Sequence, residues 1–199
     1  EKYNKKGDTV LSINQGYREG KLDVLSGKRN VEGQIYLLNN SGQEVTEPTI
    51  LGRIPRKENK NIFTNESLGT TFDTKLVRKL RTENSNVKIY YSSNANATND
   101  LKNVNNGWTE VMEPKDIKSY LIVLGEKLEK GKLIKLDYEI EIPSNLEHNN
   151  QALTYSMVEY GVNTNKGNIR YYQMSSTVGL STGEGVELNI EIKADKNKV

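Results

Sequence analysis

The stretch that decides the fold is a run in the second half of the chain: Leu133-Ile134-Lys135-Leu136-Asp137-Tyr138-Glu139-Ile140-Glu141-Ile142-Pro143. Its apolar and charged residues alternate, so an extended chain would present the apolar side chains on one face and the charged ones on the other. Pro143 ends the strand because it has no backbone N–H to donate. A strand of this kind is typical of an antiparallel sheet that packs on a second sheet. The sequence therefore predicts an all-β sandwich with this strand at its centre.

Composition supports this fold class and excludes several functions. Eleven tyrosines against two phenylalanines and one tryptophan favour strands over helices. The net charge of +2 comes from 28 basic and 26 acidic residues, and no basic patch indicates nucleic-acid binding. The absence of cysteine excludes disulfides, thiolate metal sites and a cysteine nucleophile. Nothing in the sequence resembles a signal peptide or a membrane span.

Further strands follow from alternation and from turn signals along the chain. The last of them has the same pattern as the central strand, with Val186, Leu188, Ile190 and Ile192 on one face. Helix is an alternative for residues 75–80, because Leu76 and Leu80 are four positions apart. The predicted strands cover residues 9–14, 22–25, 34–39, 49–55, 72–77, 87–91, 119–124, 133–143, 152–160, 169–178 and 186–194.

These strands predict one β-sandwich domain over residues 9–199, preceded by a frayed N-terminus at residues 1–8. Long insertions interrupt it, above all the asparagine-rich residues 93–107. A division into two domains near residue 110 is the alternative. Because the chain starts at Glu1 and not at Met, we interpret it as a segment of a longer protein.

Two regions carry a resemblance to a known family. The run Ile35-Tyr36-Leu37-Leu38-Asn39-Asn40-Ser41-Gly42, followed by Gly52-Arg53-Ile54-Pro55, resembles the repeat domains of bacterial cell-surface proteins. Residues 125–131 and 175–192 are similar to later parts of the same repeats in large clostridial and bacillar adhesins. The resemblance spans residues 31–199. It implies an immunoglobulin-like sandwich on a cell-wall-attached, extracellular protein of a Gram-positive bacterium.

Catalysis has little support in the sequence, so we predict that the chain is not an enzyme. His148, the single histidine, follows Glu147 in a polar loop, but no Gly-x-Ser-x-Gly motif supplies a nucleophile. We therefore interpret His148 as a solvated loop residue. No pair of acids stands out in an apolar setting, as a glycosidase would require.

Metal binding and cross-linking are also weakly indicated. Residues 94–100 are rich in amides but contain one carboxylate, Asp100, whereas a strong calcium loop has several. We predict no cofactor. Surface domains of this class can join a strand lysine to an asparagine, which requires a neutral, buried amine. Lys75, Lys135 and Asn189 lie on predicted strands, but Lys135 and Asn189 fall on faces predicted to be exposed.

The sequence favours a structural or adhesive module, a stalk or a ligand-presenting domain. Its expected partners are neighbouring domains of the same surface protein, and a host matrix protein or glycan if it binds a ligand. The best candidate for ligand contact is the asparagine-rich excursion, with core packing as the other interpretation of Trp108. The alternative function is a carbohydrate-binding module, which would need Trp108 and Tyr91 exposed in one plane. The predicted ligand-binding residues are Tyr91, Asn94, Asn96, Asp100 and Trp108.

Overall fold

The structure, a computed structural model, describes residues 11–17, 21–22 and 29–183. The predicted frayed residues 1–8 and the predicted strand at 186–194 lie outside this range. The described strands are β1 (Ser12–Tyr17), β2 (Lys21–Leu22), β3 (Asn30–Leu38), β4 (Thr46–Arg53), β5 (Lys75–Arg81), β6 (Val87–Ser92), β7 (Ser119–Leu124), β8 (Leu133–Glu141), β9 (Gln151–Thr154), β10 (Ser156–Thr164), β11 (Gly167–Met174) and β12 (Val178–Thr182). Two short 3-10 helices, η2 (Val104–Asn106) and η3 (Pro114–Asp116), lie between β6 and β7.

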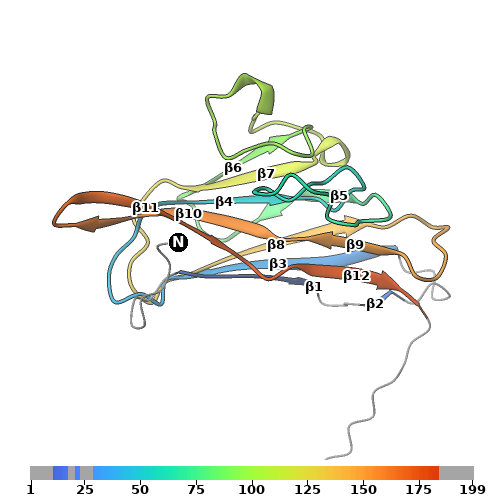
Figure 1. Cartoon of the computed structure of the whole chain (residues 1–199), viewed down its shortest axis with the longest axis horizontal. Helices are drawn as coiled ribbons and strands as arrows, with labels where there is room; N and C mark the ends of the chain where they lie inside the picture. Colours follow the sequence, from blue (N-terminus) through green and yellow to red (C-terminus); the bar gives the residue numbers. More distant parts are fainter. Residues whose placement is uncertain (1–10, 18–20, 23–28, 184–199) are drawn as a thin grey trace, which may run out of the picture.

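Two antiparallel sheets form the sandwich, elongated along the strands (Figure 1). The four-stranded sheet has the order β1-β3-β8-β5, and the five-stranded sheet has the order β11-β10-β4-β7-β6. A three-stranded sheet, β2-β12-β9, extends one end, and its β2–β12 pair is parallel. The main core lies between the two large sheets and includes fully buried Ile35, Ile50 and Ile122.

The predicted central strand is confirmed as β8. It pairs with β3 along its whole length, from Leu133 opposite Leu38 to Glu141 opposite Asn30. Its alternation fits this position, because the apolar residues from Ile134 to Ile142 are at most 5% exposed. The charged residues face outward, where Arg29 pairs with Glu141 at 2.7 Å.

Two predicted strands are each divided between sheets, which corrects their boundaries. The strand expected at 152–160 is β9 and β10, separated at Tyr155, and the strand expected at 169–178 ends as β11 at Met174. Ser156 and Ser175 mark this corner: the Ser175 amide donates to the Ser156 carbonyl at 2.9 Å, and the Ser156 amide donates to the Ser175 hydroxyl at 3.0 Å. Strands commonly change sheets at such corners.

The helix alternative at residues 75–80 is wrong. This segment is β5, which pairs with the second half of β8 and carries two irregularities in its register. The spacing is misleading because residues four positions apart also lie on the same face of a strand, and both Leu76 and Leu80 are buried there.

Two glycines let tyrosine rings cross the core. Gly33 on β3 lies opposite Tyr138 on β8, and Gly52 on β4 lies opposite Tyr120 on β7. Each ring lies over its glycine so closely that a Cβ at Gly33 would be 2.2 Å from Tyr138 Cζ, and one at Gly52 would be 2.1 Å from Tyr120 Cζ. Both sheets thus use a glycine to admit a buried tyrosine.

The hydroxyl ends of these tyrosines meet in a polar network inside the sandwich. The side-chain nitrogen of Gln15 donates to the Tyr138 hydroxyl at 3.0 Å, and the Ser156 hydroxyl donates to the side-chain oxygen of Gln15 at 2.5 Å. The Tyr120 and Ser156 oxygens are 3.4 Å apart. Tyr17 packs edge-on against Tyr138. Burial raises the pKa of the phenols of Tyr17, Tyr120 and Tyr138.

Candidate binding surface

Two loops pack on part of the outer face of the five-stranded sheet: residues 54–69, after β4, and residues 93–108, after β6. Beneath them lies a second apolar cluster, formed by buried Leu51, Leu121 and Met157. Ile62 from the first loop and Trp108 from the second pack on this cluster. Each loop is therefore anchored by one side chain to an apolar cluster of the sheet.

Asn106 holds the second loop in shape. Its side chain is 3% exposed, and its amide nitrogen donates to the Thr98 carbonyl, the Thr98 hydroxyl and the Asp100 carbonyl. Its amide oxygen accepts from the Thr98 amide at 3.0 Å. The Trp108 indole also donates to the Thr98 carbonyl, at 3.0 Å. Asn106 thus forms hydrogen bonds with backbone groups of the loop that no neighbouring strand can reach. A buried amide side chain commonly has this role in an irregular loop.

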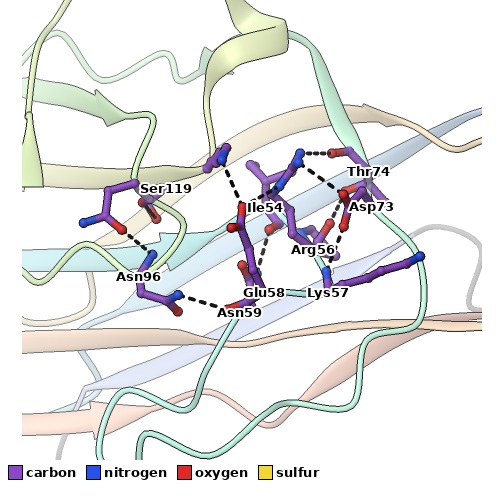
Figure 2. A network of polar contacts seen from close by, with 12 residues as sticks. Ile54, Arg56, Lys57, Glu58, Asn59, Asp73, Thr74, Asn96 and Ser119 are labelled. Atoms are coloured by element: carbon purple, nitrogen blue, oxygen red, sulfur yellow. Dashed lines mark hydrogen bonds and ion pairs between the residues drawn. The ribbon is translucent and has the colours of Figure 1, made fainter.

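Asn96 joins the two loops to each other. Its amide nitrogen donates to the Glu58 carbonyl at 2.9 Å (Figure 2). Its amide oxygen accepts from the Lys60 amide, also at 2.9 Å. The Asn96 side chain therefore forms the hydrogen bonds that a neighbouring strand would otherwise form with the backbone of residues 58–60. On the same side, the Asn59 side chain donates to the Ile54 carbonyl at 2.7 Å.

Arg53 is the charged group at the junction of the two loops. Its guanidinium is buried and donates to the Lys60 carbonyl of one loop and to the Ala97 carbonyl of the other, the latter at 3.3 Å. Burial lowers the pKa of Arg53. Because its hydrogen bonds go to backbone carbonyls of both loops, Arg53 fastens them to β4.

Replacing Arg53 with methionine is expected to destabilise the protein by about 2 kcal/mol, since the buried Ala97 carbonyl and the partly buried Lys60 carbonyl would lose their donor. Chemical denaturation should measure the loss, and limited proteolysis should show faster cleavage within residues 56–69 and 93–107. Arg29→Met is the matched control, because Arg29 forms an exposed ion pair with Glu141 that is worth about 0.5 kcal/mol. Equal effects of the two substitutions would contradict the role assigned to Arg53.

A charged network joins the first loop to Asp73, which lies before β5 (Figure 2). Glu58 accepts from Lys118 at 2.9 Å and from Arg56 at 3.2 Å, and the bond from Lys118 is the main cause of its lowered pKa. Asp73 accepts from Arg56 at 3.2 Å and from the Lys57 amide at 2.8 Å. These carboxylates are engaged with cations and backbone, as in a structural network. Among the described residues, no group of three or more His, Asp or Glu side chains could hold a metal ion.

The structure does not bring the predicted ligand-binding residues together on one surface. Tyr91 is 3% exposed and lies in the main core, with Lys79 Nζ 5.5 Å from its ring centre, and burial raises its pKa to about 12. Trp108 lies half-buried on the opposite face of the sheet. The exposed aromatic plane that a carbohydrate-binding module would need is therefore not formed by Tyr91 and Trp108.

The remaining predicted residues lie on the second loop, and their polar groups are used within the protein. Asn94 is exposed and donates to the Asn105 carbonyl at 3.3 Å, while Asp100 is exposed and accepts from the Lys102 amide at 2.9 Å. Sequence reasoning missed Asn106 and Arg53. The one sequence feature that could have indicated a role for Arg53 is its position directly before Ile54-Pro55, at the end of a predicted strand.

The residues considered for other chemistry lie apart from this surface. His148 is exposed in the loop before β9. Lys75 and Lys135 are exposed on β5 and β8, so neither has the buried setting that a neutral amine requires. Asn189 lies outside the described residues. In the part of the chain that the structure describes, no helix is long and apolar enough to cross a membrane.

Comparisons with known proteins bear on the fold. No protein-family model matches the sequence, and a search of curated proteins finds no significant match. The chain is similar in structure to the major pilin subunit BcpA of Bacillus cereus, with a TM-score of 0.50 at 10% identity, over 88% of this chain and 41% of that one. A single-substitution variant of BcpA gives a TM-score of 0.53 with the same identity and coverage. A type I cohesin from Pseudobacteroides cellulosolvens gives 0.43 at 7% identity, over 91% of this chain and 98% of that one.

The chain thus spans about two fifths of the length of that pilin. At 10% identity the likeness shows the fold and does not show the function. It confirms the predicted fold class: the chain is an all-β, immunoglobulin-like antiparallel β-sandwich with long loop insertions.

Proposed function

We propose that the chain is a non-catalytic, load-bearing module of an extracellular bacterial surface protein, a stalk segment attached through its neighbouring domains to the cell wall. The observation that carries the proposal is the geometry of β1 and β12, the first and last strands that the structure describes. β1 begins at one end of the four-stranded sheet, β12 ends near the opposite end of the molecule, and both run in the same direction along the long axis (Figure 1). A pull on the two chain ends would therefore act along both strands.

This geometry favours mechanical resistance. β1 is hydrogen-bonded to β3 along its length, from Ser12 opposite Leu38 to Tyr17 opposite Gly33. β12 is bonded to β9, and its end also pairs with β2. To slide either strand along its axis, several hydrogen bonds must break together, whereas a force across the strands would open them one after another. Unfolding under force depends on the unfolding rate, which such a barrier lowers.

The covered outer face of the five-stranded sheet supports the same role. Arg53, Asn96 and Asn106 use their polar groups to hold the loops on the sheet. The outer face of β8 carries one lysine and three acidic residues, which keep it in water and discourage contacts between sheets. Under this proposal, recognition of a host matrix protein or glycan is not the main role. If such a ligand binds, Asn94, Asn96, Asp100 and Trp108 on the second loop are its proposed contacts.

Single-molecule force spectroscopy tests the proposal directly, because the chain has no cysteine and handles can be placed freely. We expect a higher unfolding force when tandem copies are pulled through their chain ends than when handles at Gln43→Cys and Lys166→Cys are pulled. Both control positions are exposed and lie at the same end of the sandwich, since Thr46 pairs with Gly161, so the force between them crosses the strands.

Equal unfolding forces in the two geometries would overturn the load-bearing role. Saturable binding of the immobilised chain to one component of a glycan and matrix-protein array, lost on Trp108→Ala, would favour the ligand-presenting role instead. The substitution should be checked by thermal melting, because Trp108 also packs on the second apolar cluster.

A further inference from the structure

The sequence contains one Asn-Gly pair, Asn106-Gly107, near the end of the second loop. In such a pair the glycine amide nitrogen can attack the side-chain carbonyl carbon of the asparagine, because glycine has no Cβ in the way and its backbone rotates freely. The new bond joins Gly107 N to Asn106 Cγ, the Cγ–Nδ2 bond breaks, and ammonia leaves with the glycine proton. Water then opens the resulting succinimide and leaves aspartate or isoaspartate at position 106.

The folded loop holds both reacting groups away from this reaction. The Asn106 side chain is 3% exposed, and four hydrogen bonds with Thr98 and Asp100 engage its nitrogen and its oxygen. The attacking nitrogen is engaged as well, since the Gly107 amide donates to the Val104 carbonyl at 3.2 Å. Both groups must leave their partners before they can meet, so local opening of the loop must come first.

The backbone of Asn106 is also fixed. Its N–H donates to the Asn103 carbonyl at 3.0 Å, and its carbonyl accepts from the Ser92 hydroxyl. Gly107 follows in the left-handed conformation, with φ of 59°, and ends η2. Rotation of the Asn106 backbone toward its own side chain would break these bonds. The pair should therefore react more slowly in the folded chain than in a free peptide.

Deamidation at position 106 would remove what closes the loop. The amide nitrogen is the donor to the Thr98 and Asp100 carbonyls, whereas a carboxylate has only acceptor oxygens. A buried charge that faces two carbonyls costs more than a lost hydrogen bond. Isoaspartate also lengthens the backbone by one carbon, which shifts the bond between Gly107 and Val104. Refolding does not restore the lost ammonia, so the loop cannot return to its closed form.

We propose that Asn106-Gly107 is a deamidation site that fixes the second loop in an open form once the loop has opened. Trp108 follows the pair directly and packs on the second apolar cluster. Its indole donates to the Thr98 carbonyl, which Asn106 also binds. Loss of the Asn106 contacts therefore loosens Trp108 and uncovers apolar surface of the sheet. This inference does not depend on the load-bearing role, which concerns β1 and β12.

The neighbouring asparagines of the loop do not share these features. Asn103 and Asn105 are exposed, but the residues that follow them, Val104 and Asn106, each carry a Cβ that hinders the attack. A carboxylate at position 105 would lie in water, one residue away from the proposed site. Asn105→Asp is therefore the matched control for Asn106→Asp.

The first test measures the rate of deamidation at Asn106 by peptide mapping and mass spectrometry. In neutral buffer the folded whole chain should react about ten-fold or more slowly than a synthetic peptide of residues 101–112. Arg53→Met should speed the reaction in the folded chain about ten-fold, because loss of the bond to Ala97 raises the population of the open loop. Arg29→Met should leave the rate unchanged, since its ion pair is distant in the sequence and exposed.

Equal rates in the folded chain and the peptide would overturn the proposal, because the loop would then not hold the pair closed. An unchanged rate in Arg53→Met would overturn it too, because deamidation would then not depend on loop opening.

The second test examines the consequence of the modification. Asn106→Asp should speed proteolysis within residues 93–107 about ten-fold and increase binding of the hydrophobic dye ANS, whereas Asn105→Asp should behave like the unchanged chain. Because Asn106→Asp could fail to fold, the same measurements are made on unchanged chain that has deamidated during storage and been separated by ion exchange. Equal behaviour of the two aspartate variants, or a deamidated chain as resistant to protease as the original, would overturn the proposal.

Discussion

Replacing Gly52 with alanine is expected to destabilise the protein by about 3 kcal/mol, the upper range for forcing an extra carbon into a packed core. The added Cβ would lie 2.1 Å from Cζ and 2.2 Å from the hydroxyl oxygen of Tyr120. This ring is fully buried and anchored near Ser156, so it cannot swing into solvent. Urea denaturation monitored by circular dichroism should show the loss as a lower midpoint with an unchanged slope.

Gly16→Ala is the control for this prediction. Gly16 lies in β1, and a Cβ there would meet no heavy atom within 4 Å. Alanine at an unobstructed strand position is neutral or slightly stabilising, because it restricts the unfolded chain. A loss at Gly16 as large as the loss at Gly52 would show that the cost comes from the backbone and not from the tyrosine ring.

A double-mutant cycle separates the clash from other effects of alanine. Tyr120→Leu removes Cζ, Cε2 and the hydroxyl, which are the three atoms nearest to the added Cβ. In that background Gly52→Ala should cost less than about 1 kcal/mol, because neighbouring mutations that share a contact are not additive. The same logic applies across the sandwich, where Gly33→Ala should depend on Tyr138.

The sequence predicted the strands where alternation is local and continuous. β8 is the clearest case, since its period of two matches a face that is buried along the whole strand. The corners at Tyr155 and Ser175 could not be predicted in this way. A strand that changes sheets keeps its extended backbone, and the break depends on which distant strand pairs with each half.

The candidate surface was predicted only in part for a related reason. The excursion at residues 93–107 was expected to be a loop outside the main core, and it is one. Adjacent strand residues face opposite sides, so either Tyr90 or Tyr91 had to be buried in the core, but the sequence does not tell which. The inward use of Asn96 and Asn106 depends on backbone groups of residues 58–60 and 98–100, which only the folded loops bring within reach.

Alkaline unfolding is the second large effect that the structure predicts. Burial raises the folded-state pKa of Tyr17, Tyr120 and Tyr138 above the usual value of 10, and raises that of Tyr91 to about 12. Below pH 10 these phenols are protonated in both states and stability does not change. Above pH 10 the unfolded chain loses their protons while the folded core retains them, so stability falls as pH rises. For the three core phenols together, the fall is about 4 kcal/mol per pH unit.

A fall of this size exceeds the stability of most domains within two or three pH units above pH 10, so we expect cooperative unfolding between about pH 12 and pH 13. In a pH jump, tyrosinate absorbance from the buried rings should rise at the same rate as the loss of circular dichroism, because ionisation requires unfolding. Tyr120→Phe should reduce the slope of stability against pH by about one third, since each phenol contributes about 1.4 kcal/mol per unit. Full tyrosine ionisation with the fold intact, or an unchanged slope in Tyr120→Phe, would mean that the core around the three tyrosines is open to water.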